Sequence, residues 1–457
     1  MKFEIDKQTI NDLELYERTK GDKSVFSFFN QTQSIGGTEK LKRIFSSPLL
    51  DIKLLEKRID TIKYFETNPD FIEIYKEWLG FIEYYLIQSN RPKKLSLVDI
   101  IRNSVDNRIK PTNHNYIISR AITCLVKILN DLYNYAKGID LENSPEQLLE
   151  YKSTILDLIE KSELKEILLL KNKNRMGVIR KGKLDFYFRN SESEKIKVLL
   201  DIIYEIDVYK SISNAVRKYG FSYPQYTSNE VCINIEGLFH PFLEEPVSNN
   251  VNLSYSKNLC FLTGPNMAGK STYLKSFGIS VYLAHLGFPV PAVSMETSIF
   301  NGLLTTINMS DNINKGYSHY YNEVLRVKYV AEQINQLKNI VVIFDELFRG
   351  TNVMDAYEAS LAVISAFAKI NMSLFAISTH IMEVAEKLKH NESVYFKFFE
   401  IKINDDIPQY TYKLKDGVTD ERICMYILTK EKVVETIENA IHRNQTLSKS
   451  NDIINSG

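Results

Sequence analysis

The sequence reads FLTGPNMAGKSTYLKSF from Phe261 to Phe277, with two glycines and a lysine between an apolar run and a helix-like run. Residues 264–271 satisfy the pattern G-x-x-x-x-G-K-[ST], whose glycines let successive backbone N–H groups turn toward phosphate oxygens. The helix that follows adds the positive end of its dipole. Because the loop stands between an expected strand and an expected helix, it predicts a phosphate-binding site rather than an ordinary glycine-containing turn.

The two halves of the chain have different patterns of apolar residues. Before about residue 215, apolar residues recur three and four positions apart, as in residues 145–170 and 194–219, which predicts long amphipathic helices. Later, the short runs NLCFLTG, NIVVIFDE and SLFAISTH are typical of strands buried on both faces of a mostly parallel sheet. We therefore expect an all-α domain over residues 1–225 and an α/β domain over residues 226–457, joined by a turn near Pro224.

A basic segment lies between the two helical runs. The stretch RMGVIRKGKLDFYFRN has β-forming residues on both sides of Arg180, Lys181, Gly182 and Lys183, which predicts a short hairpin. Its surroundings, from Lys171 to Arg189, carry seven cations against one aspartate. Such a cluster can neutralise nucleic-acid phosphates, and it can equally be a solvated face, so the sequence leaves both interpretations open.

The overall composition excludes some classes of protein. Lysine plus arginine number 57, and so do aspartate plus glutamate, so no global field attracts the chain to nucleic acid or to an anionic membrane. No signal-peptide core and no stretch of 18 apolar residues without a charge is present, so we expect no membrane span. The cysteines form no C-x-x-C pair, which disfavours a zinc site and fits a reducing cytoplasm. They are Cys124, Cys232, Cys260 and Cys424.

An acidic pair follows the second apolar run of the later half. Asp345 and Glu346 stand at the carboxyl end of the expected strand 340–344, where open α/β sheets place ligands. With a phosphate loop nearby, Ser271 and Asp345 are suited to hold Mg²⁺, and Lys270 to bridge the terminal phosphates. Glu346 is then expected to orient or deprotonate an attacking water.

A histidine follows the third apolar run. His380 comes directly after Thr379 at the end of the expected strand, so it can sense a terminal phosphate or help to position water. A lone histidine at a strand end is more often only a satisfied polar residue. We favour the catalytic interpretation of His380 because the two neighbouring strand ends also carry the residue types that a hydrolase needs.

Together these segments resemble one family. The stretches TGPNMAGKST, FDELFRGTNVMDA and ISTHIMEVA are similar to the ATPase domain of the MutS family of DNA mismatch repair proteins, and the Asn266-Met267 pair is particular to that family's phosphate loop. The resemblance implies an ABC-type P-loop ATPase that uses ATP and Mg²⁺. It also implies nucleotide contacts from the loop residues Gly264, Pro265, Asn266, Met267, Ala268, Gly269, Lys270, Ser271 and Thr272.

The resemblance extends beyond the phosphate loop. In TTINMSDNINKGYSHYYNEV, Gly316, Ser318 and Glu323 occupy the family's glycine, serine and glutamate positions. The family's serine reaches the nucleotide of the other subunit, so the resemblance implies that Ser318 completes the site of a second copy in a homodimer. Residues 5–65 and 200–245 are similar to the family's helical core, which implies that residues 1–225 form a core and lever domain.

The sequence also departs from the family pattern. The chain begins at the core domain, so we expect neither the mismatch-reading nor the connector domain of the family, and no Smr domain after the ATPase. Ala268 replaces a glycine that is usual in the family's loop, which is a mild change unless φ must be positive. Where the family stacks an aromatic ring on adenine, this chain has Pro246 or Val247.

We therefore expect a MutS-like ATPase that closes as a homodimer around duplex or branched DNA, without classical mismatch reading. A nucleotide-gated scaffold that binds protein partners and no DNA remains an alternative, because the net charge is zero and we expect no reader domains. The ATPase subunit of a membrane transporter is a third possibility. The long helical first half and the lack of an LSGGQ-type signature disfavour it.

Overall fold

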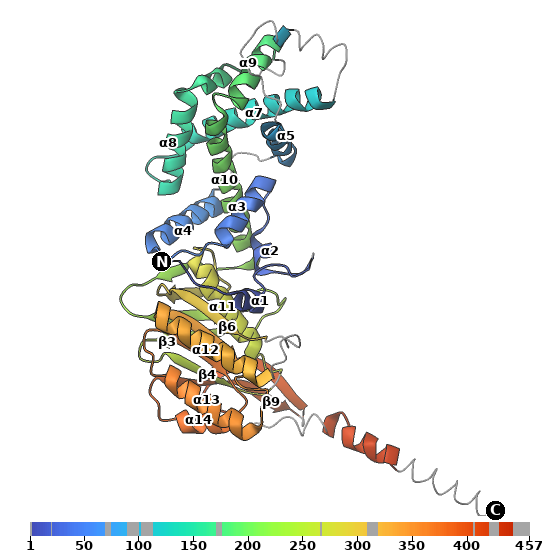
Figure 1. The fold of residues 1–457 in the computed structure, drawn as a ribbon, viewed down its shortest axis with the longest axis vertical. Helices are drawn as coiled ribbons and strands as arrows, with labels where there is room; N and C mark the ends of the chain where they lie inside the picture. The colour runs from blue at the N-terminus through green and yellow to red at the C-terminus, as the bar shows by residue number, and fades with distance from the viewer. Residues whose placement is uncertain are drawn as a thin grey trace, which may run out of the picture. The chain divides into compact units, whose positions relative to one another are not determined.

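The protein has two compact units, which are described separately. Our computed structural model describes residues 2–19, 21–68, 75–88, 100–101, 113–170, 176–265, 267–308, 319–404, 407–419 and 429–441. Residues 1–246 and 276–303 form the first unit, and residues 247–275 and 304–457 form the second. The first unit is mainly helical and the second combines helices with a sheet (Figure 1), so the chain has the mixed α/β class that the sequence predicted.

The first unit consists mainly of helices. In chain order they are α1 (Lys7–Asp12), α2 (Val25–Phe29), α3 (Ile35–Phe45), α4 (Ile52–Thr67), α5 (Lys76–Ile87), α7 (Asn113–Gly138), α8 (Glu146–Glu160), the 3-10 helix η1 (Glu163–Leu170), α9 (Val178–Arg189) and α10 (Ser193–Tyr219). The helices predicted over residues 145–170 and 194–219 are confirmed as α8 with η1, and as α10. Helix α10 ends at Gly220, whose φ of 67° is the left-handed conformation that commonly ends a helix.

Helix α10 holds the first unit together. It packs against α2, α3, α4, α8 and α9, and most of its apolar side chains are buried. Its buried Asp207 accepts hydrogen bonds from the backbone N–H groups of Gln33 and Ser34, at 3.0 Å each, and so fixes the start of α3. Lys40 of α3 pairs with Asp201 of α10 at 2.7 Å. The two helices are therefore joined by polar contacts in addition to their apolar packing.

The predicted hairpin near residue 180 is wrong, because Val178–Arg189 forms helix α9. Leu184 and Phe188 lie one helical turn apart and are both buried, so the helix presents an apolar face to its neighbours. The carboxylate of Asp185 pairs with Arg189 at 2.5 Å and accepts a hydrogen bond from Tyr85 at 2.6 Å. These tertiary contacts outweigh the β-propensity of the valine, isoleucine and aromatic residues in the segment.

A small sheet completes the first unit. The strands that this unit contributes to the sheet are β1 (Pro224–Tyr226), β2 (Cys232–Leu238) and β5 (Ser294–Thr297). Strand β5 pairs with β1 in parallel and with β2 in antiparallel orientation. Pro224, which the sequence placed in a turn between domains, therefore opens a strand.

The second unit contains a six-stranded sheet. The strands of the unit are β3 (Asn249–Ser254), β4 (Leu259–Thr263), β6 (Gly302–Thr306), β7 (Ile340–Asp345), β8 (Leu374–Ser378), β9 (Val394–Asn404) and β10 (Ile407–Asp416). The sheet order is β10-β9-β4-β8-β7-β6, with β9, β4, β8 and β7 parallel and β10 antiparallel to β9. The mostly parallel sheet and its three predicted strands, β4, β7 and β8, are confirmed.

The second unit also contains helices. They are α12 (His319–Leu337), α13 (Val353–Phe367) and α14 (Met382–Leu388), and α11 (Lys270–His285) begins in this unit. Helices α12, α13 and α14, orange in Figure 1, share one apolar core with β4, β7 and β8. In that core Phe367 stacks on Phe344 and Phe375, with ring centroids 5.9 and 5.0 Å apart. This packing fixes the parallel strands, so their carboxyl ends present side chains from a rigid edge.

The cysteines that the structure describes, Cys124, Cys232 and Cys260, are free thiols, and Cys424 lies outside the described residues. Complete burial raises the pKa of the Cys260 thiol to about 11, so it remains protonated at neutral pH. Among the described helices, none has the length and apolar content needed to cross a bilayer.

His285 is a buried histidine at the end of α11, in the part of this helix that belongs to the first unit. Its Nδ1 is 2.8 Å from the Val281 carbonyl oxygen, and its Nε2 accepts a hydrogen bond from the Phe300 N–H at 2.9 Å. These partners define a neutral imidazole that donates from Nδ1. Complete burial lowers the pKa of His285 to about 4, because the charged form would lose its solvation.

His285 should make the stability of the first unit depend on pH. The unfolded chain takes up a proton near pH 6.5, whereas the folded state resists it down to about pH 4. Unfolding therefore becomes easier as the pH falls through this range, by roughly 3 kcal/mol in total from this group. We expect His285→Gln to have a flatter pH dependence of the free energy of urea unfolding between pH 4.5 and 7 than the wild type. The exposed His390→Gln is the control, and an equally steep dependence in His285→Gln would contradict this assignment.

Candidate active site

The phosphate loop connects β4 to α11 and has the backbone that its sequence requires. Gly264 and Gly269 have φ of 136° and 104°, where side chains with a Cβ are strained, and Met267 also has a positive φ of 67°. Helix α11 begins at Lys270, so the loop ends at a helix N-terminus. Asn266 lies outside the described residues. The described part of the loop therefore has the glycine conformations and the helix start that favour anion binding.

The ammonium of Lys270 lies inside the loop. Its Nζ donates to the backbone carbonyls of Gly264 and Pro265 at 2.7 and 3.0 Å, and it is 3.7 Å from Oε1 of Glu346. The side chain is almost fully buried. Burial lowers the pKa of Lys270, and the carboxylate of Glu346 opposes that shift. In the described part of the chain, the loop thus surrounds a lysine ammonium whose partners are backbone carbonyl oxygens and carboxylates.

Asp345 joins the loop to two strand ends. The hydroxyl of Ser271, in the first turn of α11, donates to Oδ2 of Asp345 at 2.5 Å. The hydroxyl of Ser378, at the end of β8, donates to Oδ1 of the same carboxylate. Asp345 is 6% exposed, so both oxygens are held in a defined orientation. The predicted pair Ser271 and Asp345 is therefore in direct contact.

Glu346 lies on a strained turn after β7. Its φ of 57° is unusual for a residue with a Cβ, and its N–H donates to the Ser378 carbonyl at 3.1 Å. Two further side chains approach its Oε2, with Nε of Arg349 at 2.8 Å and Nδ1 of His380 at 3.8 Å. His380 is more than half exposed. The structure thus brings Lys270, Glu346 and His380 together, as the sequence predicted.

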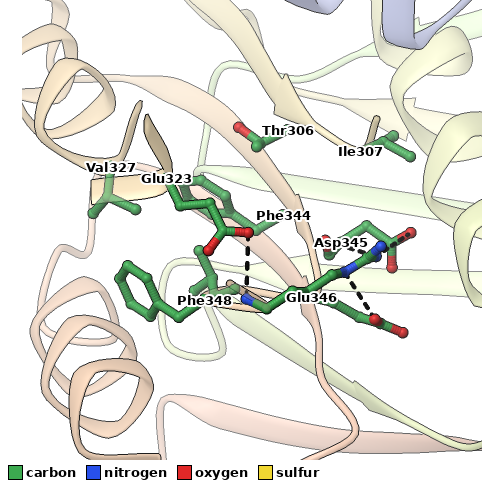
Figure 2. A pocket seen from close by; sticks show the side chains of 10 residues that line it. Thr306, Ile307, Glu323, Val327, Phe344, Asp345, Glu346 and Phe348 are labelled. Atoms are coloured by element: carbon green, nitrogen blue, oxygen red, sulfur yellow. Dashed lines mark hydrogen bonds and ion pairs between the residues drawn. The ribbon is translucent and has the colours of Figure 1, made fainter. Parts of the chain in front are cut away.

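Two residues around this turn were not assigned a role from the sequence. Figure 2 shows a pocket whose lining includes Asp345, Glu346 and Glu323. Arg349 also lines it, with Nε 2.8 Å from Oε2 of Glu346 and Nη2 3.8 Å from Oδ2 of Asp345. The buried Glu323 of α12 accepts hydrogen bonds from the Arg349 and Gly350 N–H groups at 3.3 and 3.5 Å. Arg349 stands three and four residues after the acidic pair, and that spacing in a turn was the only available sequence signal.

An aromatic residue beside the loop was also missed. A Cβ on Gly269 would lie 3.4 Å from the ring of Tyr412, which is 45% exposed. Asn249 fixes this part of β10 by donating to the Tyr412 carbonyl at 2.9 Å and accepting from the Leu414 N–H at 2.8 Å. The sequence drew attention to Pro246 or Val247, whereas the ring beside the loop comes from β10, a strand far along the chain.

Other residues that the sequence singled out lie outside the described part of the chain or make contacts elsewhere. Ser318, the predicted contact to a second subunit, lies outside the described residues. In the basic stretch, Lys171, Lys173 and Arg175 also lie outside them. Lys181 donates to Ser119 at 2.6 Å, Lys183 pairs with Glu166 at 2.5 Å, and the buried Arg189 pairs with Asp185, while Arg180 is exposed. Much of this charge is therefore used within the helical unit.

Comparison with known proteins gives the family of this site. Residues 260–448, which include the loop, the acidic pair and the histidine, match the family model described as MutS domain V. The chain is 24% identical to the DNA mismatch repair protein MutS of Petrotoga mobilis, over 91% of this chain and 61% of that protein. Together these matches support a MutS-family protein. This confirms the resemblance on which the sequence-based expectations rested.

Other relatives extend this MutS-family assignment. The chain is 24% identical to the DNA mismatch repair protein MSH3 of Vanderwaltozyma polyspora, over 94% of this chain and 53% of that protein. It is 32% identical to MutS protein homolog 4 of Mus musculus, over 49% of this chain and 24% of that protein. The chain thus spans 61% and 53% of the length of the first two relatives.

The hydrogen bonds of Ser378 should contribute to the stability of the second unit. Ser378→Ala removes a buried donor to Asp345 and an acceptor for the Glu346 N–H, so we expect the free energy of unfolding to fall by about 1–3 kcal/mol. Ser373→Ala is the matched control, because Ser373 is equally buried and bonds the Ile340 N–H and the Lys338 carbonyl. Urea unfolding followed by circular dichroism checks both. Stability unchanged in Ser378→Ala but lowered in Ser373→Ala would contradict the assigned bonds.

Proposed function

We propose that this MutS-family chain binds Mg-ATP in the loop of the second unit and hydrolyses it. One observation carries the proposal: Ser271 contacts Asp345 at 2.5 Å, while Lys270 lies 3.7 Å from Glu346. A phosphate loop, a hard-metal ligand pair and a carboxylate for water activation therefore meet at one sheet edge. This combination is the minimum set for hydrolysis of a nucleoside triphosphate.

The residues present fit a magnesium ion. Mg²⁺ binds oxygen ligands, commonly one or two protein groups together with phosphates and water. The Ser271 hydroxyl and the Asp345 carboxylate are adjacent oxygen donors, and Ser378 fixes the orientation of that carboxylate. When bound, Mg²⁺ would neutralise charge on the phosphate oxygens.

The remaining steps are assigned to side chains of the chain itself. The loop N–H groups and Lys270 hold the phosphates, which requires the ammonium to leave the Gly264 and Pro265 carbonyls. Glu346 accepts or orients the proton of the attacking water, and His380 assists from the neighbouring strand end. Tyr412 offers its exposed ring to a base beside the loop.

Glu346→Gln tests the catalytic assignment. The amide keeps the size of the side chain but cannot accept a proton, so we expect turnover to fall by about 10²–10⁴-fold while nucleotide affinity changes little. Phosphate release in single-turnover and steady-state assays, with affinity from a fluorescent ATP analogue, measures both quantities. The exposed Glu358→Gln on α13 is the matched control. Unchanged turnover in Glu346→Gln would remove Glu346 from this role.

We further propose that the protein acts on DNA as a homodimer, with Ser318 completing the site of the second copy, in the cytoplasm. The names of the relatives, DNA mismatch repair protein MutS and MSH3, support DNA as the partner. The equal numbers of acidic and basic residues support the alternative, a nucleotide-gated scaffold for protein partners. The internally paired cations of α9 also favour that alternative.

Salt-dependent DNA binding separates these two functions. A DNA-binding ATPase should bind duplex or branched DNA at low salt, with an affinity that falls linearly with the logarithm of salt concentration. Electrophoretic mobility shifts with linear duplexes and four-way junctions, each with and without ATP, make the measurement. No binding to any of these structures at about 50 mM salt would favour the scaffold.

A further inference from the structure

The turn that carries Glu346 is strained, and neighbouring side chains hold it. Glu346 and Phe348 have φ of 57° and 60°, which side chains with a Cβ rarely adopt. Two residues with a positive φ so close in sequence keep this conformation only where contacts with the surrounding structure fix the backbone. The conformation of this turn therefore depends on its contacts and not on local preference.

Helix α12 supplies the principal contacts to this turn. The ring of Tyr320 packs against the buried Phe348, with centroids 5.8 Å apart. One helical turn later, Glu323 accepts from the N–H groups of Arg349 and Gly350, using one carboxylate oxygen for each. Glu323 is 7% exposed, so water cannot readily replace it. The first two turns of α12 thus hold the backbone that follows the acidic pair.

Arg349 connects the turn that α12 contacts to the acidic pair Asp345 and Glu346. Its Nε pairs with Oε2 of Glu346 at 2.8 Å, and its Nη2 donates to the Asp345 carbonyl at 3.3 Å. With Oε2 engaged in this way, Oε1 of Glu346 is the oxygen directed at Lys270, 3.7 Å away. Oε1 is therefore the oxygen that faces the position expected for the terminal phosphate and the attacking water.

We propose that Glu323 and Arg349 are positioning residues for the catalytic carboxylate of Glu346. Glu323 fixes the backbone of the turn, and Arg349, held on that backbone, orients Glu346 by binding one of its oxygens. The arrangement follows the general rule that a catalytic base is itself oriented by a further group. This inference rests on the proposed ATPase function and adds the elements that control its base, so a movement of α12 would change the rate of hydrolysis.

The backbone contact is tested without nucleotide. In Glu323→Gln the amide nitrogen cannot accept, so at least one of the N–H groups of Arg349 and Gly350 loses its partner. We expect faster hydrogen exchange in a peptide spanning residues 346–350 of the full-length variant. The control is Glu332→Gln, also on α12 but exposed, whose exchange should match the wild type. Unchanged exchange in Glu323→Gln would overturn the proposal, whether or not the protein hydrolyses ATP.

The effect on Glu346 is tested by kinetics. Glu323→Gln and Arg349→Gln should each lower kcat by about tenfold or more, with ATP affinity within about threefold of the wild type. Because both act through one turn, the double variant should be about as slow as the slower single variant. Arg349→Lys should recover part of the rate, since it can pair with Glu346 but lacks the second donor. Additive losses, or losses confined to ATP affinity, would contradict the positioning role.

These outcomes are distinct from failure of the proposed function. If the wild type hydrolyses ATP and Glu346→Gln does not, an unchanged kcat in Glu323→Gln rejects only the positioning role. If the wild type shows no hydrolysis, the proposed function fails. The hydrogen-exchange measurement alone then shows whether Glu323 holds the N–H groups of Arg349 and Gly350. Should Glu323→Gln fail to fold, the variants of Arg349 still test the role, because that side chain is 44% exposed.

Discussion

The hydrogen bonds to the Asp345 carboxylate are the interaction on which the second unit's site depends. Ser271 belongs to the helix after the phosphate loop, Asp345 ends β7, and Ser378 ends β8. In the sequence, Ser271 and Ser378 are 74 and 33 residues away from Asp345. A single buried carboxylate therefore sets the register between the loop and the two strand ends. The apolar core beneath it keeps those ends from separating.

The charges around Glu346 explain how carboxylates are tolerated at this depth. Burying a charge is costly unless partners compensate for the lost solvation. Lys270 and Arg349 supply that compensation, at 3.7 and 2.8 Å from the two oxygens of Glu346. A bound triphosphate would compete for Lys270. Ligand binding would then redistribute these contacts without leaving Glu346 unpaired, because Arg349 remains on its second oxygen.

Much of the fold and site was predictable because their signals are local. The loop pattern, the apolar strands and the acidic residues at a strand end each lie in one short segment, so periodicity and residue chemistry identify them. The signal for α9 was weak, since its β-forming residues are helical only because Leu184 and Phe188 find a buried face. Tyr412 reaches the site from β10 through tertiary packing, which no local pattern records. Glu323 occupies a family motif position in the sequence, but its contacts with the turn after β7 depend on how α12 packs.

We propose that the loop, Asp345 and Glu346 form one magnesium-nucleotide site, and a crystal structure with Mg²⁺ and a non-hydrolysable ATP analogue is the decisive measurement. We expect Mg²⁺ at about 2.1 Å from the Ser271 hydroxyl and beside Asp345, with the Lys270 ammonium moved from the Gly264 carbonyl to the phosphates. A triphosphate bound elsewhere, or Lys270 still on that carbonyl, would rule out such a site.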